Sequence, residues 1–245
     1  MTSLQTLSNT DRTSWKRIAM VWRFYLPYTR RKLLGFTLLA FAVEGMMLFA
    51  FEYMPAQQST PILLMLSVMI AALMAFSGLV FAKPRGRELQ TLLPALGMEK
   101  SIVIIGYVTI VIPFLLSVPS LLSLLFGGYS TEIKVATLFG VELNPAVAIY
   151  SALMMESMAL SCLWAVLASK RKYAMRNGVL AVAAFYLLLT FASGFVSGLI
   201  AGFCGYTDDL INVYSEIIYS ILAAVCGIYI IFALIKCCHI IKHGI

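Results

Sequence analysis

Two glutamates are the clearest candidates for chemistry in an otherwise apolar chain. Glu44 and Glu156 each lie inside a run of about 20 apolar residues. A carboxyl group at bilayer depth is costly, and such groups usually face a cavity or the interior of a helix bundle. Each glutamate is therefore either a carboxyl group on a translocation path or a protonated side chain bonded to a neighbouring helix, and the sequence leaves both interpretations open.

No other set of residues matches a catalytic or metal-binding pattern. His239 and His243 are four residues apart, but they sit in a basic tail and lack the glutamate of a metalloprotease motif. The five cysteines include no C-x-x-C pair and no histidine at metal-ligand spacing. Most are expected to be small packing residues, and Cys237 and Cys238 to be a packed or solvated thiol pair. We expect no metal site, no cofactor and no enzymatic activity on this chain.

The composition determines the solvent that the chain needs. It is 61% hydrophobic and 12% charged, with a mean hydropathy of +0.93. A soluble domain has about 45–50% apolar and about 25% charged residues. Lipid offers no partner for an open backbone group, so only helices or closed barrels cross it, and the long apolar runs lack the alternation of barrel strands. The sequence predicts an all-α membrane protein.

Six apolar runs are long enough to cross a bilayer. The expected spans are 33–54, 61–82, 102–126, 145–168, 179–203 and 215–236. Residues 1–32 are expected to be a cytoplasmic segment with an amphipathic interfacial helix that includes Trp15 and Trp22 and ends at Pro27. Residues 237–245 are expected to be a cytoplasmic tail. No cleavable signal peptide is expected, because the first long apolar run can itself span the membrane.

Basic residues mark one side of the membrane. All of the 18 Lys and Arg residues except Lys134 fall in the N-terminal segment, the loops after the second and fourth spans, or the tail. Because positively charged loops stay in the cytoplasm, both termini are expected there, and six spans are favoured over five or seven. This placement also explains the net charge of +7 without a nucleic-acid partner.

Three glycines in the fifth predicted span recur every four residues. Gly194, Gly198 and Gly202 form two overlapping G-x-x-x-G units, which expose a strip of backbone for close helix contact. Ser193 and Ser197 lie beside this strip and can hydrogen-bond across it. Packing within the chain and a dimer interface are both compatible with the pattern.

The loop after the second span, 83–100, has the most informative pattern in the chain. It reads KPRGRELQTLLPALGMEK, in which Pro84 and Gly86 break the span and Pro94 ends a short helix. One side of that helix is an apolar ridge of Leu89, Leu92 and Leu93. A ridge with charged flanks such as Glu88 fits a groove on a soluble partner, whereas a solvated turn with a few buried leucines fits the pattern equally well.

The same loop carries a family resemblance. The pattern R-x5-LPA-x3-EK, formed by Arg87, Leu93, Pro94, Ala95, Glu99 and Lys100, resembles the first cytoplasmic loop of ABC-2-type transporter permeases, particularly short six-span members from Bacteroidetes. A basic amphipathic helix also precedes the first of six spans in that family. The topology agrees over the whole chain, and the residue-level similarity covers this one loop.

The resemblance implies the permease subunit of an ATP-binding cassette exporter in the bacterial inner membrane. Such a subunit pairs with a second copy or a paralogue and with ATPase subunits, which bind ATP and Mg²⁺. Arg87 to Pro94 would enter the ATPase groove, with Glu99 and Lys100 at its edge. This chain has no G-x-x-x-x-G-K-[ST] loop, so hydrolysis would occur on the separate ATPase. Many family members have a long external segment between the last two spans, whereas residues 204–214 are short.

Two other classes of function fit a chain of this kind. A secondary transporter would use Glu44 or Glu156 as a proton site, although no Gly/Pro-interrupted pair of spans stands out in matching halves. A membrane scaffold would need only the helices and a partner surface.

Overall fold

The computed structural model describes residues 15–53, 65, 68–81, 97–126, 145–170, 172–204 and 208–243, and within these ranges it is almost entirely helical, with no strand. The elements in chain order are α2 (Trp15–Tyr53), η1 (Ser77–Phe81), α5 (Gly97–Gly106), η2 (Tyr107–Val111), α6 (Ile112–Phe126), α8 (Pro145–Ala168), α9 (Ala174–Cys204) and α10 (Asp208–His243). The all-helical prediction is confirmed for this part of the chain.

Within the described ranges, five helices are long and apolar enough to cross a membrane. Their apolar portions are Thr29–Ala50, Gly97–Pro119, Ile149–Ala168, Ala174–Phe195 and Glu216–Lys242. Large side chains on these helices point outward: Leu38 is 68% exposed and Phe191 is 75% exposed. Apolar surface on this scale needs a lipid solvent, so the chain is a multi-pass membrane protein.

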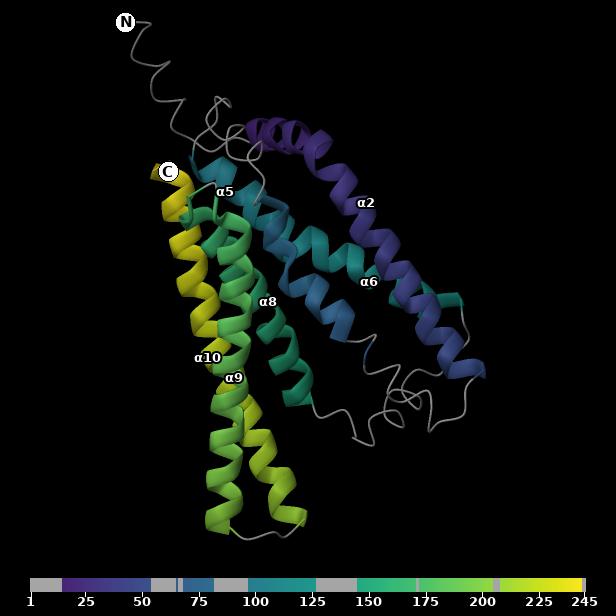
Figure 1. The fold of residues 1–245 in the computed structure, drawn as a ribbon, viewed down its shortest axis with the longest axis vertical. Helices are drawn as coiled ribbons and strands as arrows, with labels where there is room; N and C mark the ends of the chain where they lie inside the picture. The colour runs from purple at the N-terminus through teal and green to yellow at the C-terminus, as the bar shows by residue number, and fades with distance from the viewer. Residues whose placement is uncertain are drawn as a thin grey trace, which may run out of the picture.

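The helix array divides into two groups (Figure 1). α8, α9 and α10 lie together, and α5 packs against the end of α10, while α2 and α6 lie side by side on the opposite flank. The starts of α2, α5 and α9 and the end of α10 all lie at one end of the array (Figure 1). The main hydrophobic core is near that end and includes Tyr25, Ile104, Tyr107, Leu163 and Cys237.

The predicted end of the N-terminal helix at Pro27 is wrong. α2 runs through Pro27 as one helix of 39 residues and bends in its first part (Figure 1). Proline removes one backbone donor and pushes its ring against the preceding turn, which bends a helix without always ending it. The Thr29 hydroxyl donates to the carbonyl oxygen of Tyr25 at 3.1 Å, an added bond of the kind that stabilises such bends.

The predicted C-terminal tail, 237–245, is helical over most of its length, because α10 continues to His243. Cys237 and Ile241 are buried in the main core. A Cβ added to Gly97 would lie 2.6 Å from the Cα atom of Lys242, so the first turn of α5 touches the backbone of α10. The end of α10 stays helical because α5 gives it a surface to pack against.

α8 has the same bounds as the fourth predicted span, 145–168, and its portion Ile149–Ala168 is long and apolar enough to cross a membrane. The second predicted span, 61–82, is described only at residue 65 and over 68–81. There it is α-helical from 68 to 75 and then tightens into η1. A Cβ on Gly78 would lie 2.5 Å from the backbone nitrogen of Leu163, so only glycine permits this approach of η1 to α8.

Candidate functional site

Aromatic rings join the N-terminal part of α2 to the core at one end of the array. Trp22 stacks on Tyr107, with ring centroids 4.3 Å apart and planes 12° apart. Phe81 meets both Tyr25 and Tyr107 edge to face, at 6.1 Å and 6.2 Å. Each aromatic pair of this geometry adds about 0.5–1.5 kcal/mol beyond its burial. We call Trp22, Tyr25, Phe81 and Tyr107 the aromatic junction.

An ion pair fastens the same part of α2 to the start of α5. Arg17 Nε donates to Glu99 Oε1 at 2.8 Å, and the Glu99 side chain is fully buried while that of Arg17 is 27% exposed. A buried carboxylate is tolerated only where charge and hydrogen bonds compensate its lost hydration. The family resemblance places Glu99 at the edge of a partner groove, but here Glu99 lies inside the chain and Lys100 beside it is half-buried.

Three hydroxyl groups lie buried in or beside the junction. Tyr25 Oη, Tyr107 Oη and Ser77 Oγ have no hydrogen-bond partner within the described ranges. Burial raises the pKa of Tyr25 above its usual value, so this phenol stays neutral at any physiological pH. The aromatic junction therefore consists of neutral side chains, and the Arg17–Glu99 ion pair links the same part of α2 to α5.

The third predicted span is interrupted by a π-helical turn, η2, between α5 and α6. The Ile112 N–H donates to the carbonyl oxygen of Tyr107, five residues back. Pro113 follows at once; it has no N–H, and its ring would press on the carbonyl of Thr109 in a regular helix, so the wider turn relieves that clash. The π turn directs Tyr107 and Val108 into the core, where both are fully buried.

Glu156 lines a pocket at the middle of α8. The pocket has a volume of about 490 Å³, and its walls come from the helix at 68–75, from α6 and from α8: Ile70, Ala71, Met74, Pro113, Ser151, Ala152, Met155, Glu156 and Ala159. The walls are otherwise apolar apart from Ser151, so a carboxyl group here can bind a proton or a polar group of a substrate.

Glu44 lies elsewhere. It is half-buried on α2, whose main helical neighbours are α5 and α6, and it does not line the Glu156 pocket. The structure thus separates the two glutamates that the sequence singled out. Glu156, in a pocket, is the better candidate for a translocation path.

The coupling residues of the loop mostly lie outside the described residues. This holds for Arg87, Glu88, Leu89, Leu92, Leu93, Pro94 and Ala95. The loop's last four residues, 97–100, form the first turn of α5. The end of the loop is thereby joined rigidly to the helix that leads to η2.

The glycine strip of α9 makes no close helix contact within the described part of the chain. A Cβ added to Gly194, Gly198 or Gly202 would meet nothing within 4 Å, and all three glycines are exposed. Ser193 donates to the carbonyl oxygen of Thr190 on its own helix at 3.0 Å. Of the two interpretations of the glycine strip, packing against another helix of the same chain is not seen among the described residues.

Several polar links between helices were missed at the sequence level. Ser161 Oγ and Tyr229 Oη are 2.7 Å apart and join α8 to α10. Asn177 Nδ2 donates to Ser169 Oγ at 2.7 Å and closes the turn between α8 and α9. Serines spaced four apart in an apolar run, as at Ser157 and Ser161, are the signal that could have indicated this contact.

Cys162, Cys226 and Cys237 are buried free thiols and Cys238 is half-buried. No group of three or more metal-ligating side chains occurs among the residues that the structure describes.

Searches for a matching protein-family model, a similar curated protein and a similar solved structure each gave no match.

Proposed function

We propose that this chain is the membrane subunit of an ATP-binding cassette exporter, energised by a separate ATPase that docks on the loop 83–100. The observation that carries the proposal is the Arg17–Glu99 ion pair, which fastens the end of that loop to the N-terminal part of α2. A soluble ATPase can move membrane helices only through a segment that is rigidly attached to them. The ion pair and the aromatic junction attach the end of the loop and the N-terminal part of α2 to the helix core.

A continuous structural path leads from the loop to the Glu156 pocket. Glu99 is in the first turn of α5, α5 continues into η2, and Pro113, which lies in α6 directly after η2, lines the pocket. π turns are weaker than α-helix and are frequent at functional sites. Movement of the loop would therefore shift α5 as a unit and change the pocket at Pro113, which gives two arrangements with different access.

The charge distribution supports six spans with the loop in the cytoplasm. Arg17, Lys100 and Arg176 lie in α2, α5 and α9, whose starts are at one end of the array (Figure 1). Basic residues gather on the cytoplasmic side of a membrane protein. This placement favours both described ends of the chain in the cytoplasm and an even number of crossings, so that an ATPase in the cytoplasm would reach the loop.

The partners follow from the proposal. The chain has no P-loop, so an ATPase that binds ATP and Mg²⁺ is required. A second permease, either another copy or a paralogue, would complete the path, and the exposed glycine strip of α9 is available for such a contact.

The test is the change Leu92→Asp, which puts a charge on the apolar ridge, with Gln90→Asp as the matched control beside it. We expect Leu92→Asp to abolish co-purification of a P-loop ATPase from native membranes in mild detergent, while Gln90→Asp retains it. An equal yield of ATPase, with equal ATP hydrolysis, from both variants would contradict the proposal.

A stand-alone secondary transporter is the second candidate, because Glu156 faces a pocket of adequate size. In that case Glu156→Gln would abolish proton-coupled uptake by liposomes that contain this chain alone. A chain that needs the ATPase shows no such uptake even before the change.

A further inference from the structure

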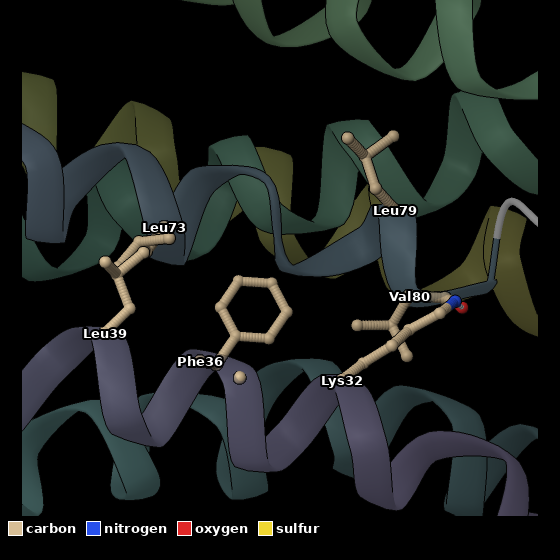
Figure 2. Close-up of a pocket in the computed structure, with 7 residues that line it drawn as sticks. Lys32, Phe36, Leu39, Leu73, Leu79 and Val80 are labelled. Atoms are coloured by element: carbon tan, nitrogen blue, oxygen red, sulfur yellow. Dashed lines mark hydrogen bonds between the residues drawn. The ribbon is translucent and has the colours of Figure 1, made fainter.

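A second cavity lies on the lipid-facing side, between α2 and the segment that ends in η1. It is an open groove of about 350 Å³, lined by Lys32, Gly35, Phe36, Leu39, Leu73, Leu79 and Val80. Figure 2 shows Phe36 standing between the two segments, with Leu39 and Leu73 facing each other further along. Apart from Lys32, every lining side chain is apolar.

The one charged group stands at the end of the groove. The Lys32 ammonium donates to the carbonyl oxygen of Val80, near the end of η1, and this bond holds the long side chain across the groove (Figure 2). Arg30 and Arg31 precede Lys32 and are exposed. Three successive cations therefore stand where α2 enters its apolar portion, which begins at Thr29.

The floor of the groove is open at Gly35. A Cβ added there would meet nothing within 4 Å, and Gly35 is exposed. From Lys32 to Leu39 the helix rises about 10 Å. The hydrocarbon layer of one leaflet is about 15 Å thick. The groove thus runs from the level of the headgroups through most of one leaflet.

We propose that this groove is a binding site for an anionic phospholipid, with the phosphate at Lys32 and one acyl chain along Phe36, Leu39 and Leu73. Charge complementarity selects the headgroup, because Arg30, Arg31 and Lys32 together attract an anion at the membrane surface. A soluble anion has no acyl chain to fill the apolar part of the groove. A neutral lipid gains nothing from the cations. The site is independent of which energy source drives the protein.

The structure also indicates what a lipid would do there. α2 meets the segment of residues 73–81 along the groove, and Lys32 is bonded to Val80 at its end. An acyl chain in the groove fills space between these two segments, so bound lipid would hold α2 against η1 and hence against the aromatic junction. We expect anionic lipid to raise the thermal midpoint of the purified protein, since a ligand that binds only the folded state stabilises it.

The experiment titrates phosphatidylglycerol, and separately phosphatidylcholine, into delipidated protein in mild detergent and follows binding by native mass spectrometry and the thermal midpoint. Lys32→Gln keeps a donor for Val80 but loses the charge, and should weaken phosphatidylglycerol binding about fivefold without affecting phosphatidylcholine. Lys32→Arg should retain the preference. Gly35→Leu fills the groove and should weaken both lipids, whereas Gly45→Leu, at another open glycine of α2, should not.

Three results would overturn the proposal. Gly35→Leu could bind lipid as Gly45→Leu does, Lys32→Gln could affect both lipids equally, or inorganic phosphate or oleate could match phosphatidylglycerol in raising the midpoint. The midpoint without lipid reports folding of each variant. If Lys32→Gln fails to fold, two measurements still test the proposal. These are lipid binding by Gly35→Leu compared with Gly45→Leu, and the preference of Lys32→Arg for phosphatidylglycerol.

Discussion

Removal of Arg17 tests whether the N-terminal part of α2 is fastened to the start of α5. In Arg17→Gln the Glu99 carboxylate, fully buried, loses a charged donor at 2.8 Å. Breaking a buried pair from one side costs about 3–5 kcal/mol, and the partial exposure of Arg17 places the expected loss near the lower end, about 3 kcal/mol. For a chain of this size that corresponds to a fall of roughly 6–12 °C in the thermal midpoint.

The buried cysteines supply the assay. Cys162, Cys226 and Cys237 are shielded in the folded protein, so a thiol-reactive fluorophore reports unfolding in detergent. Arg23→Gln, an exposed arginine on the same helix, is the control and should shift the midpoint by less than about 2 °C.

The double-mutant cycle with Glu99→Gln separates the pair from its surroundings. We expect a coupling energy of about 1–3 kcal/mol between Arg17 and Glu99, since both groups share one buried bond. If Arg17→Gln lowers the midpoint no more than Arg23→Gln, or the coupling energy is zero, the ion pair does not fasten α2 to α5.

Two further predictions concern helix contacts. Gly78→Ala should lower the free energy of unfolding by about 1–3 kcal/mol, because the added Cβ would press on the Leu163 backbone. Gly45→Ala, at a glycine with open space around it, should not destabilise the protein. The thiol-reactivity assay compares the thermal midpoints of the two variants, and equal midpoints would contradict the close approach of η1 to α8. Ser161→Ala and Tyr229→Phe should each lower the free energy of unfolding by about 1 kcal/mol, because each removes the same hydrogen bond. Additive losses in the double variant would show that the two hydroxyl groups do not pair.

The sequence predicted the membrane environment, the helical class and the bounds of α8 well, because these depend on local composition and on the length of the apolar runs. It failed at Pro27, since whether a proline ends or bends a helix depends on what packs around it. Here Trp22 and Tyr25, before the proline, are held in the core by Tyr107 and Phe81. The extension of α10 was missed for the same reason, because Gly97 provides the contact from another part of the chain.

The candidate site was predictable in part. Glu156 could be singled out as a carboxyl group at bilayer depth, but its pocket is formed by side chains from three separate segments, which no local pattern reveals. Pro113, which follows η2 in the third predicted span, is one of these side chains. The role of Glu99 was predicted differently, because a charged residue next to a loop is expected to be exposed, and the sequence does not show that Arg17 pairs with it inside the chain.

The central claim is that ATP hydrolysis elsewhere changes access to the Glu156 pocket. The most direct measurement is the labelling rate of Ser151→Cys, in the pocket wall, by a membrane-impermeant thiol reagent in vesicles prepared from native membranes, where the proposed ATPase would be present. We predict that trapping with ATP and vanadate changes this rate, and that Leu92→Asp abolishes the change. A labelling rate that does not change with ATP and vanadate but changes with a proton gradient would contradict the account.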